Sequence, residues 1–225
     1  MPARYLLGER LGAGATGETF AAVDSSDGAA CVVKLFAAGE EARGAALAEL
    51  AGLRTLAHAS VVRVRDVGRA TDGRMFITTD RVSGPGVDSI ASIADEAERR
   101  AVLQRAARDL AGALAHVHSR GIVHGDVCPA NVRLAADGRA ILIDFGLAGP
   151  PAAGRGGARG TLGYAAPEAL TGDRTPAVDL FALGATLYEA WSATAPFGRG
   201  LPAVQRMLGE AAPALSSIRP GLGEG

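Results

Sequence analysis

Apolar positions in the first 80 residues fall into short runs of the length and spacing typical of β-strands. The expected strands are Leu6–Leu11, Thr19–Val23, Cys31–Phe36, Val61–Val67 and Met75–Thr79. A glycine-rich stretch separates the first two runs, which predicts a hairpin with that stretch as its turn. One helix is expected over Glu40–Leu56, where apolar residues recur at helical spacing.

The pattern becomes helical after Gly84. The segment Glu96–Ser119 predicts an amphipathic helix, with Leu103, Ala107, Leu110, Leu114 and Val117 on one stripe. A strand pair is expected at Val132–Leu134 and Ala140–Ile143. The segment Val178–Trp191 is apolar on nearly every side, which predicts a buried helix, and a shorter helix is expected at Leu201–Leu208.

These elements predict an α+β fold in two parts. Residues 1–82 would form a β-rich lobe with one helix, and residues 83–225 a mainly helical lobe, with a short connector near residues 80–86.

Composition narrows the class of protein. A hydrophobic content of 48% with 21% charged residues fits a globular chain and argues against disorder. The net charge of -1 gives no reason to expect a nucleic-acid or membrane partner. Two cysteines make no disulfide framework, and no stretch reaches the roughly 18 apolar residues of a membrane span. A cytoplasmic location is the expectation.

Lys34 is the only lysine among 23 basic residues, so this position is expected to need a compact ammonium that arginine cannot supply. It follows Gly12-x-Gly14-x-x-Gly17, in which glycines let the backbone approach phosphates. Together they suggest a phosphate site. Taken alone, the lysine also fits chance in an arginine-biased chain, and the glycines fit a plain hairpin turn.

A second cluster follows the long helix. Asp126 and Asn131 lie five residues apart on one loop, and Asp144 follows after a predicted two-strand turn that brings it back alongside. Two carboxylates and an amide around one point offer ligands for Mg²⁺ and a base for a hydroxyl. The alternative is a loop capped by Asx turns without a ligand.

The order of these motifs resembles a eukaryotic-type Ser/Thr protein kinase catalytic domain, as found in bacteria. The shared features are the glycine loop, the strand lysine, a helix glutamate, His124-x-Asp126-x-x-x-x-Asn131, Asp144-Phe-Gly146, Ala166-Pro-Glu168 and Asp179-x-Phe-x-x-Gly184. Gly160-Thr161-x-x-Tyr164 resembles the substrate-facing loop of Ser/Thr kinases rather than Tyr kinases. The resemblance runs from about Tyr5 to Pro220 and implies a bilobal fold.

The resemblance also implies a role for each matching residue. Gly12, Gly14 and Gly17 would cover the phosphates of ATP, and Lys34 would hold them while paired with Glu49. Asp126 would accept the proton of a protein Ser/Thr hydroxyl, and Asn131 and Asp144 would hold Mg²⁺. The adenine shell and hinge would consist of Val32, Thr79, Asp80, Val82 and Arg133, and Asp179 would brace the catalytic loop.

The chain departs from this family at several positions. Cys128 replaces a lysine that reaches the transferring phosphate, a loss that could cost on the order of 10²-fold in rate. Cys128 itself is expected to be a small packed residue. Gly125 replaces the arginine that pairs with a phosphorylated activation loop, and no Ser, Thr or Tyr lies between Asp144 and Gly160. Activation-loop phosphorylation is therefore not expected. Arg133 is unusual for an adenine pocket.

The family's last helices are not expected within this chain, which would leave Glu168 without its usual arginine and suggests further domains in a longer protein. A nucleotide-binding pseudokinase or scaffold is the alternative function. A small-molecule kinase of the aminoglycoside or choline type is a weaker one, motivated by His124-Gly-Asp126.

Overall fold

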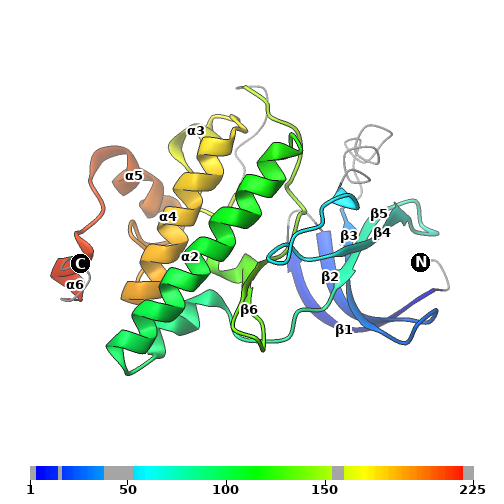
Figure 1. Ribbon diagram of the computed structural model, residues 1–225. Helices are drawn as coiled ribbons and strands as arrows, with labels where there is room; N and C mark the ends of the chain where they lie inside the picture. The colour runs from blue at the N-terminus through cyan, green and yellow to red at the C-terminus, as the bar shows by residue number, and fades with distance from the viewer. Residues whose placement is uncertain (1–3, 15–16, 38–52, 154–159, 220–225) are drawn as a thin grey trace. The chain divides into compact units, whose positions relative to one another are not determined.

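The computed structural model describes residues 4–14, 17–37, 53–153 and 160–219 (Figure 1). The chain divides into two compact units, residues 1–82 and residues 83–225. The first unit holds an antiparallel sheet and the second is mainly helical, which confirms the expected α+β class.

Unit 1 is built on five antiparallel strands in the spatial order β1-β2-β3-β5-β4. The strands are β1 (Tyr5–Gly14), β2 (Gly17–Asp24), β3 (Ala30–Phe36), β4 (Val64–Arg69) and β5 (Met75–Asp80). The hairpin of β1 and β2 confirms the predicted pairing across the glycine-rich stretch. Most of the predicted helix at 40–56 lies outside the described residues.

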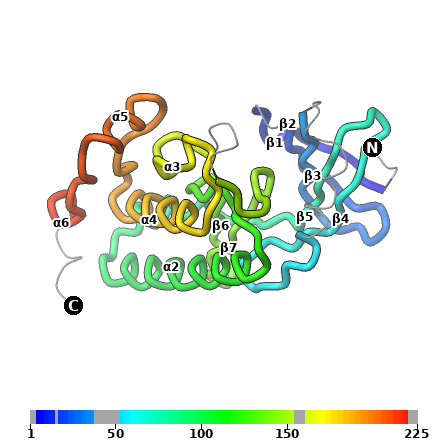
Figure 2. Tube along the Cα trace, turned by 90° about the horizontal axis from the view of Figure 1, so that it is seen from above, coloured from blue at the N-terminus to red at the C-terminus, as the bar shows by residue number. Residues whose placement is uncertain are grey.

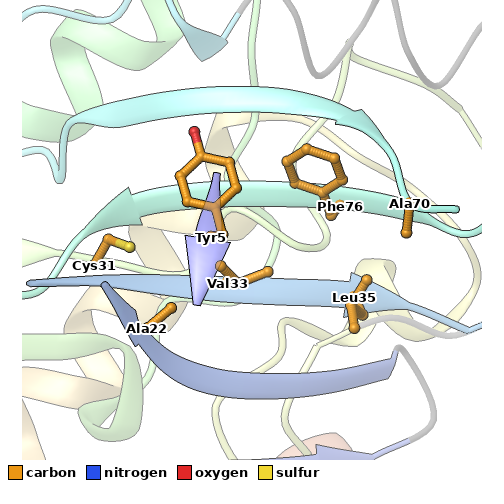
Figure 3. Packing of buried hydrophobic residues seen from close by; sticks show 7 residues of the cluster. All are labelled: Tyr5, Ala22, Cys31, Val33, Leu35, Ala70 and Phe76. Atoms are coloured by element: carbon orange, nitrogen blue, oxygen red, sulfur yellow. The ribbon is translucent and has the colours of Figure 1, made fainter. Parts of the chain in front are cut away.

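One face of this sheet forms a hydrophobic core (Figure 3). On β3 the side chains of Cys31, Val33 and Leu35 are buried and alternate with half-buried ones, the two-residue period of a strand with one face in the core. Tyr5 and Phe76 meet above them edge to face, with ring centroids 5.9 Å apart.

A buried carboxylate ties several segments of unit 1 together. Asp24, at the end of β2, is fully buried and accepts two hydrogen bonds from Arg4, which precedes β1, at 2.9 and 2.7 Å. Ser26 donates to the same carboxylate from its backbone and its hydroxyl, and Arg65 of β4 lies 3.6 Å away. The hydrogen bond from Arg4 holds the pKa of Asp24 well below its usual range.

Unit 2 is organised around two long helices, α2 (Glu96–Ser119) and α4 (Pro176–Ser192), which pack side by side (Figures 1 and 2). The other elements are η2 (Val87–Ser92), η3 (Pro129–Asn131), β6 (Val132–Leu134), β7 (Ala140–Leu142), α3 (Pro167–Leu170), α5 (Leu201–Gly209) and α6 (Leu215–Ile218). Trp191 of α4 is completely buried, as the apolar pattern of that segment predicted.

Two sequence expectations need correction. The strand expected at 61–67 begins at Val64, because the amide of Val61 donates to the carbonyl of His58 and closes the turn that precedes the strand. The buried face of α2 is also narrower and shifted. Small residues, Ala106 and Ala113, occupy buried positions on it, whereas Leu103 is only half-buried.

Candidate functional site

The carboxylate of Asp126 is held by three donors from two segments. Thr161 donates to Oδ1 from its backbone amide and from its hydroxyl, each at 2.8 Å. Asn131 donates from Nδ2 to Oδ2 at 2.9 Å and to the backbone carbonyl of Asp126 at 2.8 Å. The loop that carries Asp126 is thus closed on itself by Asn131 and joined to the Gly160–Tyr164 segment by Thr161.

Asp179, in the first turn of α4, holds the backbone of the same loop. Its fully buried carboxylate accepts the backbone amides of His124 and Gly125, each at 2.8 Å, and contacts Nε2 of His118 at 2.8 Å. These contacts compensate for the desolvation of the carboxylate. The geometry agrees with the bracing role that the sequence suggested for Asp179.

Gly125 has a backbone conformation that favours glycine. Its φ is +77°, and a Cβ at this position would lie 3.2 Å from the carbonyl oxygen of Leu147. A side chain here would strain the loop next to Asp126.

Asn131 and His124 connect this loop to the segment that carries Asp144. The amide of Ile143 donates to the carbonyl of Asn131 at 2.9 Å, and Nε2 of His124 lies 3.1 Å from the carbonyl of Ile143. The His124 ring also packs on Phe145, with centroids 4.8 Å apart. Asp144 therefore emerges next to Asn131, as the two-strand turn of β6 and β7 predicted.

Asn131 and Asp144 have the oxygen ligands that a magnesium ion requires. Since the amide nitrogen of Asn131 donates to Asp126, its side-chain oxygen is the atom that could face a cation. Asp144 has a left-handed backbone, with φ +57°, and its Oδ1 accepts the amide of Gly146 at 3.0 Å. Strain of this kind is typical of functional sites. Among the described residues, no three His, Cys, Asp or Glu side chains form a metal site.

In unit 1 the strand register gathers the predicted nucleotide-binding residues on one face of the sheet. Lys34 on the central strand β3 lies opposite Thr19 of β2, and two residues earlier Val32 lies opposite Thr79 of β5. Directly opposed residues, and residues two apart on a strand, point to the same face. Lys34, Val32 and Thr79 therefore share one face, which is opposite to the face that carries Cys31, Val33 and Leu35.

The glycines of the predicted phosphate loop differ from one another. Gly17 has φ +134°, and a Cβ there would lie 2.0 Å from the carbonyl oxygen of Leu35, so only glycine fits. At Gly12 and Gly14 a Cβ would meet no described atom within 4 Å, which leaves the backbone of β1 accessible at these positions.

The predicted hinge residues end unit 1. The carboxylate of Asp80 binds Nε of Arg65, and its amide donates to the carbonyl of Arg63 at 3.0 Å. The side chain of Asp80 is thus engaged by β4, and Val82 is half-buried. In unit 2, Arg133 is half-buried on β6 opposite Ile141. Glu49, the expected partner of Lys34, lies outside the described residues.

Cys128 is confirmed as a packed residue. Its side chain is buried against Tyr164 and Ala185, and this burial, followed by the nearby charge of Asp126, raises the pKa of the thiol to about 11. The thiol is therefore protonated and neutral at physiological pH, at a position where the family resemblance implies a lysine.

The sequence analysis missed a second buried carboxylate, Glu189 of α4. It accepts a short hydrogen bond from the Tyr164 hydroxyl and an ion pair from Arg199. The available signal was a single acidic residue within the apolar segment 180–192. Glu168, by contrast, is half-buried.

Comparisons with known proteins agree with this geometry. The protein kinase domain model matches residues 5–212. The DNA damage-responsive serine/threonine-protein kinase RqkA of Deinococcus radiodurans is 35% identical over 203 residues, which cover 86% of this chain and 30% of the relative. Serine/threonine-protein kinase PknD of Mycobacterium tuberculosis is 31% identical over 233 residues, which cover 96% of this chain and 34% of the relative.

A plant relative shares the same region. CBL-interacting protein kinase 4 of Oryza sativa is 35% identical over 180 residues, which cover 74% of this chain and 39% of the relative. The chain thus spans between 30% and 39% of the length of these three curated relatives. The match of the family model over most of the chain, together with the geometry around Asp126, shows that the chain belongs to the protein kinase domain family, within the eukaryotic-like Ser/Thr group that bacteria carry.

Proposed function

We propose that this chain transfers the γ-phosphoryl group of ATP, with Mg²⁺, to a Ser or Thr hydroxyl of a protein. The observation that carries the proposal is the Asp126 carboxylate, which Thr161 and Asn131 hold in one orientation next to the segment of Asp144. A fixed carboxylate beside potential cation ligands suits proton abstraction from a hydroxyl during phosphoryl transfer.

In this mechanism the acceptor oxygen forms a bond to the γ-phosphorus while the bond between that phosphorus and the β–γ bridging oxygen breaks, and ADP leaves. The hydroxyl proton passes to Oδ1 or Oδ2 of Asp126. Asn131 and Asp144 would hold Mg²⁺, which neutralises phosphate charge when bound. Asp179 keeps the backbone of His124 and Gly125 in place throughout.

Unit 1 would supply the nucleotide contacts. Gly12, Gly14 and Gly17 would lie over the phosphates, and Lys34 would pair with them and with Glu49. The adenine would contact Val32, Thr79 and the backbone of Asp80 and Val82, and Arg133 is the adenine contact proposed from unit 2.

The segment that follows Asp144 supports regulation without activation-loop phosphorylation. It offers no hydroxyl before Thr161, and the Thr161 hydroxyl already donates to Asp126. Gly125 supplies no guanidinium to receive a phosphate. We infer that Asp126 reaches its working orientation through Thr161 and Asn131 without this modification.

A nucleotide-binding pseudokinase or scaffold is the second candidate. The observation in its favour is Cys128, whose neutral thiol stands in place of the family's cationic lysine. In either case we propose a cytoplasmic protein that acts on or binds other proteins and that carries further domains. None of the helices within the described residues has the length and apolarity of a membrane span.

Asp126→Asn separates the two candidates. Radiolabelled phosphate transfer from ATP to myelin basic protein should fall by at least about 10²-fold, because the amide cannot accept the proton. Asp72→Asn, on an exposed turn of unit 1, is the matched control and should transfer at the wild-type rate. Equal rates of phosphate transfer by the wild type and by Asp126→Asn would contradict the proposal that the chain is an enzyme. ATP-induced thermal stabilisation without any transfer by the wild type would favour the pseudokinase.

A further inference from the structure

The Thr161 hydroxyl has two polar neighbours on unit 2. One is Oδ1 of Asp126, at 2.8 Å, and the other is Sγ of Cys128, at 3.7 Å, within the range of hydrogen bonds to sulfur. A hydroxyl carries one hydrogen and two lone pairs, so it can donate to only one of these two neighbours.

The charges decide the direction of both bonds. The carboxylate of Asp126 can only accept, and a bond to an ionised acceptor is stronger than a neutral one, so the Thr161 hydrogen belongs to Oδ1. The thiol of Cys128 then serves as the donor, with its S–H directed at a lone pair of Thr161. A cysteine packed in apolar surroundings is a neutral thiol, which this direction requires.

The structure assigns to Cys128 the role of a positioning residue: its thiol donates to Thr161 and thereby fixes the rotation of the hydroxyl that donates to Asp126. This inference rests on the proposed function, since Asp126 is the proposed base. Packing supports it, because Cys128 is held in the buried cluster with Tyr164 and Ala185, whereas Thr161 is exposed.

The hydrogen bonds of Cys128 and Thr161 would orient the Asp126 carboxylate without placing a positive charge beside it. The family resemblance implies a cation at position 128, whereas here a neutral donor completes the series of hydrogen bonds from the core, through Thr161, to Oδ1. Asn131 holds the other oxygen independently at 2.9 Å. Loss of the thiol should therefore loosen one side of the carboxylate and leave nucleotide binding unaffected.

The test compares the rate of transfer to myelin basic protein among variants at both positions. Cys128→Ala should lower kcat by about tenfold, because misorientation of a general base removes part of its contribution, while the KM for ATP stays unchanged. Cys128→Ser, which keeps a donor, should restore most of the rate. Cys31→Ala, at the buried cysteine of β3, is the matched control and should leave kcat unchanged.

A double variant tests whether Cys128 acts on the rate through Thr161. In a Thr161→Val background, which removes the hydroxyl at an exposed position, Cys128→Ala should cause no further loss of kcat. Thermal unfolding of each variant verifies that it folds.

Three results would overturn the inference: equal kcat for Cys128→Ala and wild type, equal losses for the Ala and Ser variants, or an undiminished effect of Cys128→Ala in the Thr161→Val background. Wild-type transfer that does not depend on Asp126 would instead contradict the proposed function, and the positioning role with it.

Discussion

Single buried carboxylates fix the local geometry of this molecule at several points. Asp179 holds two backbone amides, and Glu189 accepts from Tyr164 and Arg199. A buried charge is tolerated where such donors surround it, and the removal of one donor leaves part of the desolvation penalty uncompensated. The stability of unit 2 should therefore depend on hydroxyl groups that an apolar core does not otherwise need.

Tyr164→Phe tests this dependence. The change removes the donor to Glu189 without opening a large cavity, and it should lower the free energy of unfolding by about 1–3 kcal/mol. Tyr188→Phe is the matched control, since the Tyr188 hydroxyl donates to the carbonyl of Pro213 at 2.9 Å, a neutral acceptor, and its loss should be smaller. Chemical denaturation measures both. A larger loss in the control would contradict the assignment.

Contacts between individual residues could be predicted from the sequence where the two residues lie close together in the chain. Asp126 and Asn131 lie on one short loop, so their proximity followed from spacing. The partners of Glu189 could not be read in this way. Tyr164 precedes it by 25 residues and Arg199 follows it by 10, and only the packing of α4 brings the three together.

At the scale of elements, the strands of unit 1 are joined at one end by charged side chains as well as by the sheet. Arg65 of β4 binds Asp80 of β5 and, at 2.9 Å, Asp27 in the turn between β2 and β3. Asp24 extends this network to Arg4 before β1. Strands β2 and β4 are not neighbours in the sheet, so these ion pairs connect strands that the backbone ladder does not.

This network should make unit 1 sensitive to acid. Because Arg4 lowers the pKa of Asp24 below the usual value of about 3.9, the stability that its carboxylate contributes is present above about pH 4 and is lost as the pH falls below it. Asp24→Asn should therefore lower the Tm at pH 7, and the difference from wild type should narrow toward pH 3. Asp72→Asn, at a half-exposed position, should show a much smaller difference at pH 7. A gap that stays constant with pH would contradict this assignment.

The elements themselves were largely predictable. Helix α2 has the bounds that its apolar stripe predicted, and β1 and β2 pair across the glycine-rich stretch. The start of β4 was not predictable, because Val61 and Val62 continue the apolar run and are buried although they precede the strand, directly after a turn. The apolar pattern of a sequence indicates which residues are buried. Residues can remain buried beyond the point at which the hydrogen bonds of the sheet end, so the pattern does not give the start of a strand.

For the whole molecule, the proposed function requires both units. Unit 1 carries Lys34 and the glycines, whereas unit 2 carries Asp126, Asn131 and Asp144. A ligand that binds only the folded chain should therefore stabilise it in a way that depends on residues of each unit.

Nucleotide binding measured by thermal shift tests this requirement. At saturating concentration, ATP with Mg²⁺ should raise the Tm by roughly 5 °C. Lys34→Met should remove most of this rise, and Asp144→Asn should remove the part that depends on Mg²⁺. Arg69→Met, which replaces a basic residue at the exposed end of β4, is the control and should respond like the wild type. An unchanged response of both test variants would contradict the nucleotide assignment.

The attachment of the His124–Asn131 loop to α4 has a further consequence for local unfolding. Surface loops usually open more readily than the helices around them. Here the amides of His124 and Gly125 donate to Asp179, in the first turn of a helix whose last turn holds the buried Trp191. Opening of the loop would break these hydrogen bonds to α4, so we expect the two amides to exchange with solvent as slowly as those of the helix.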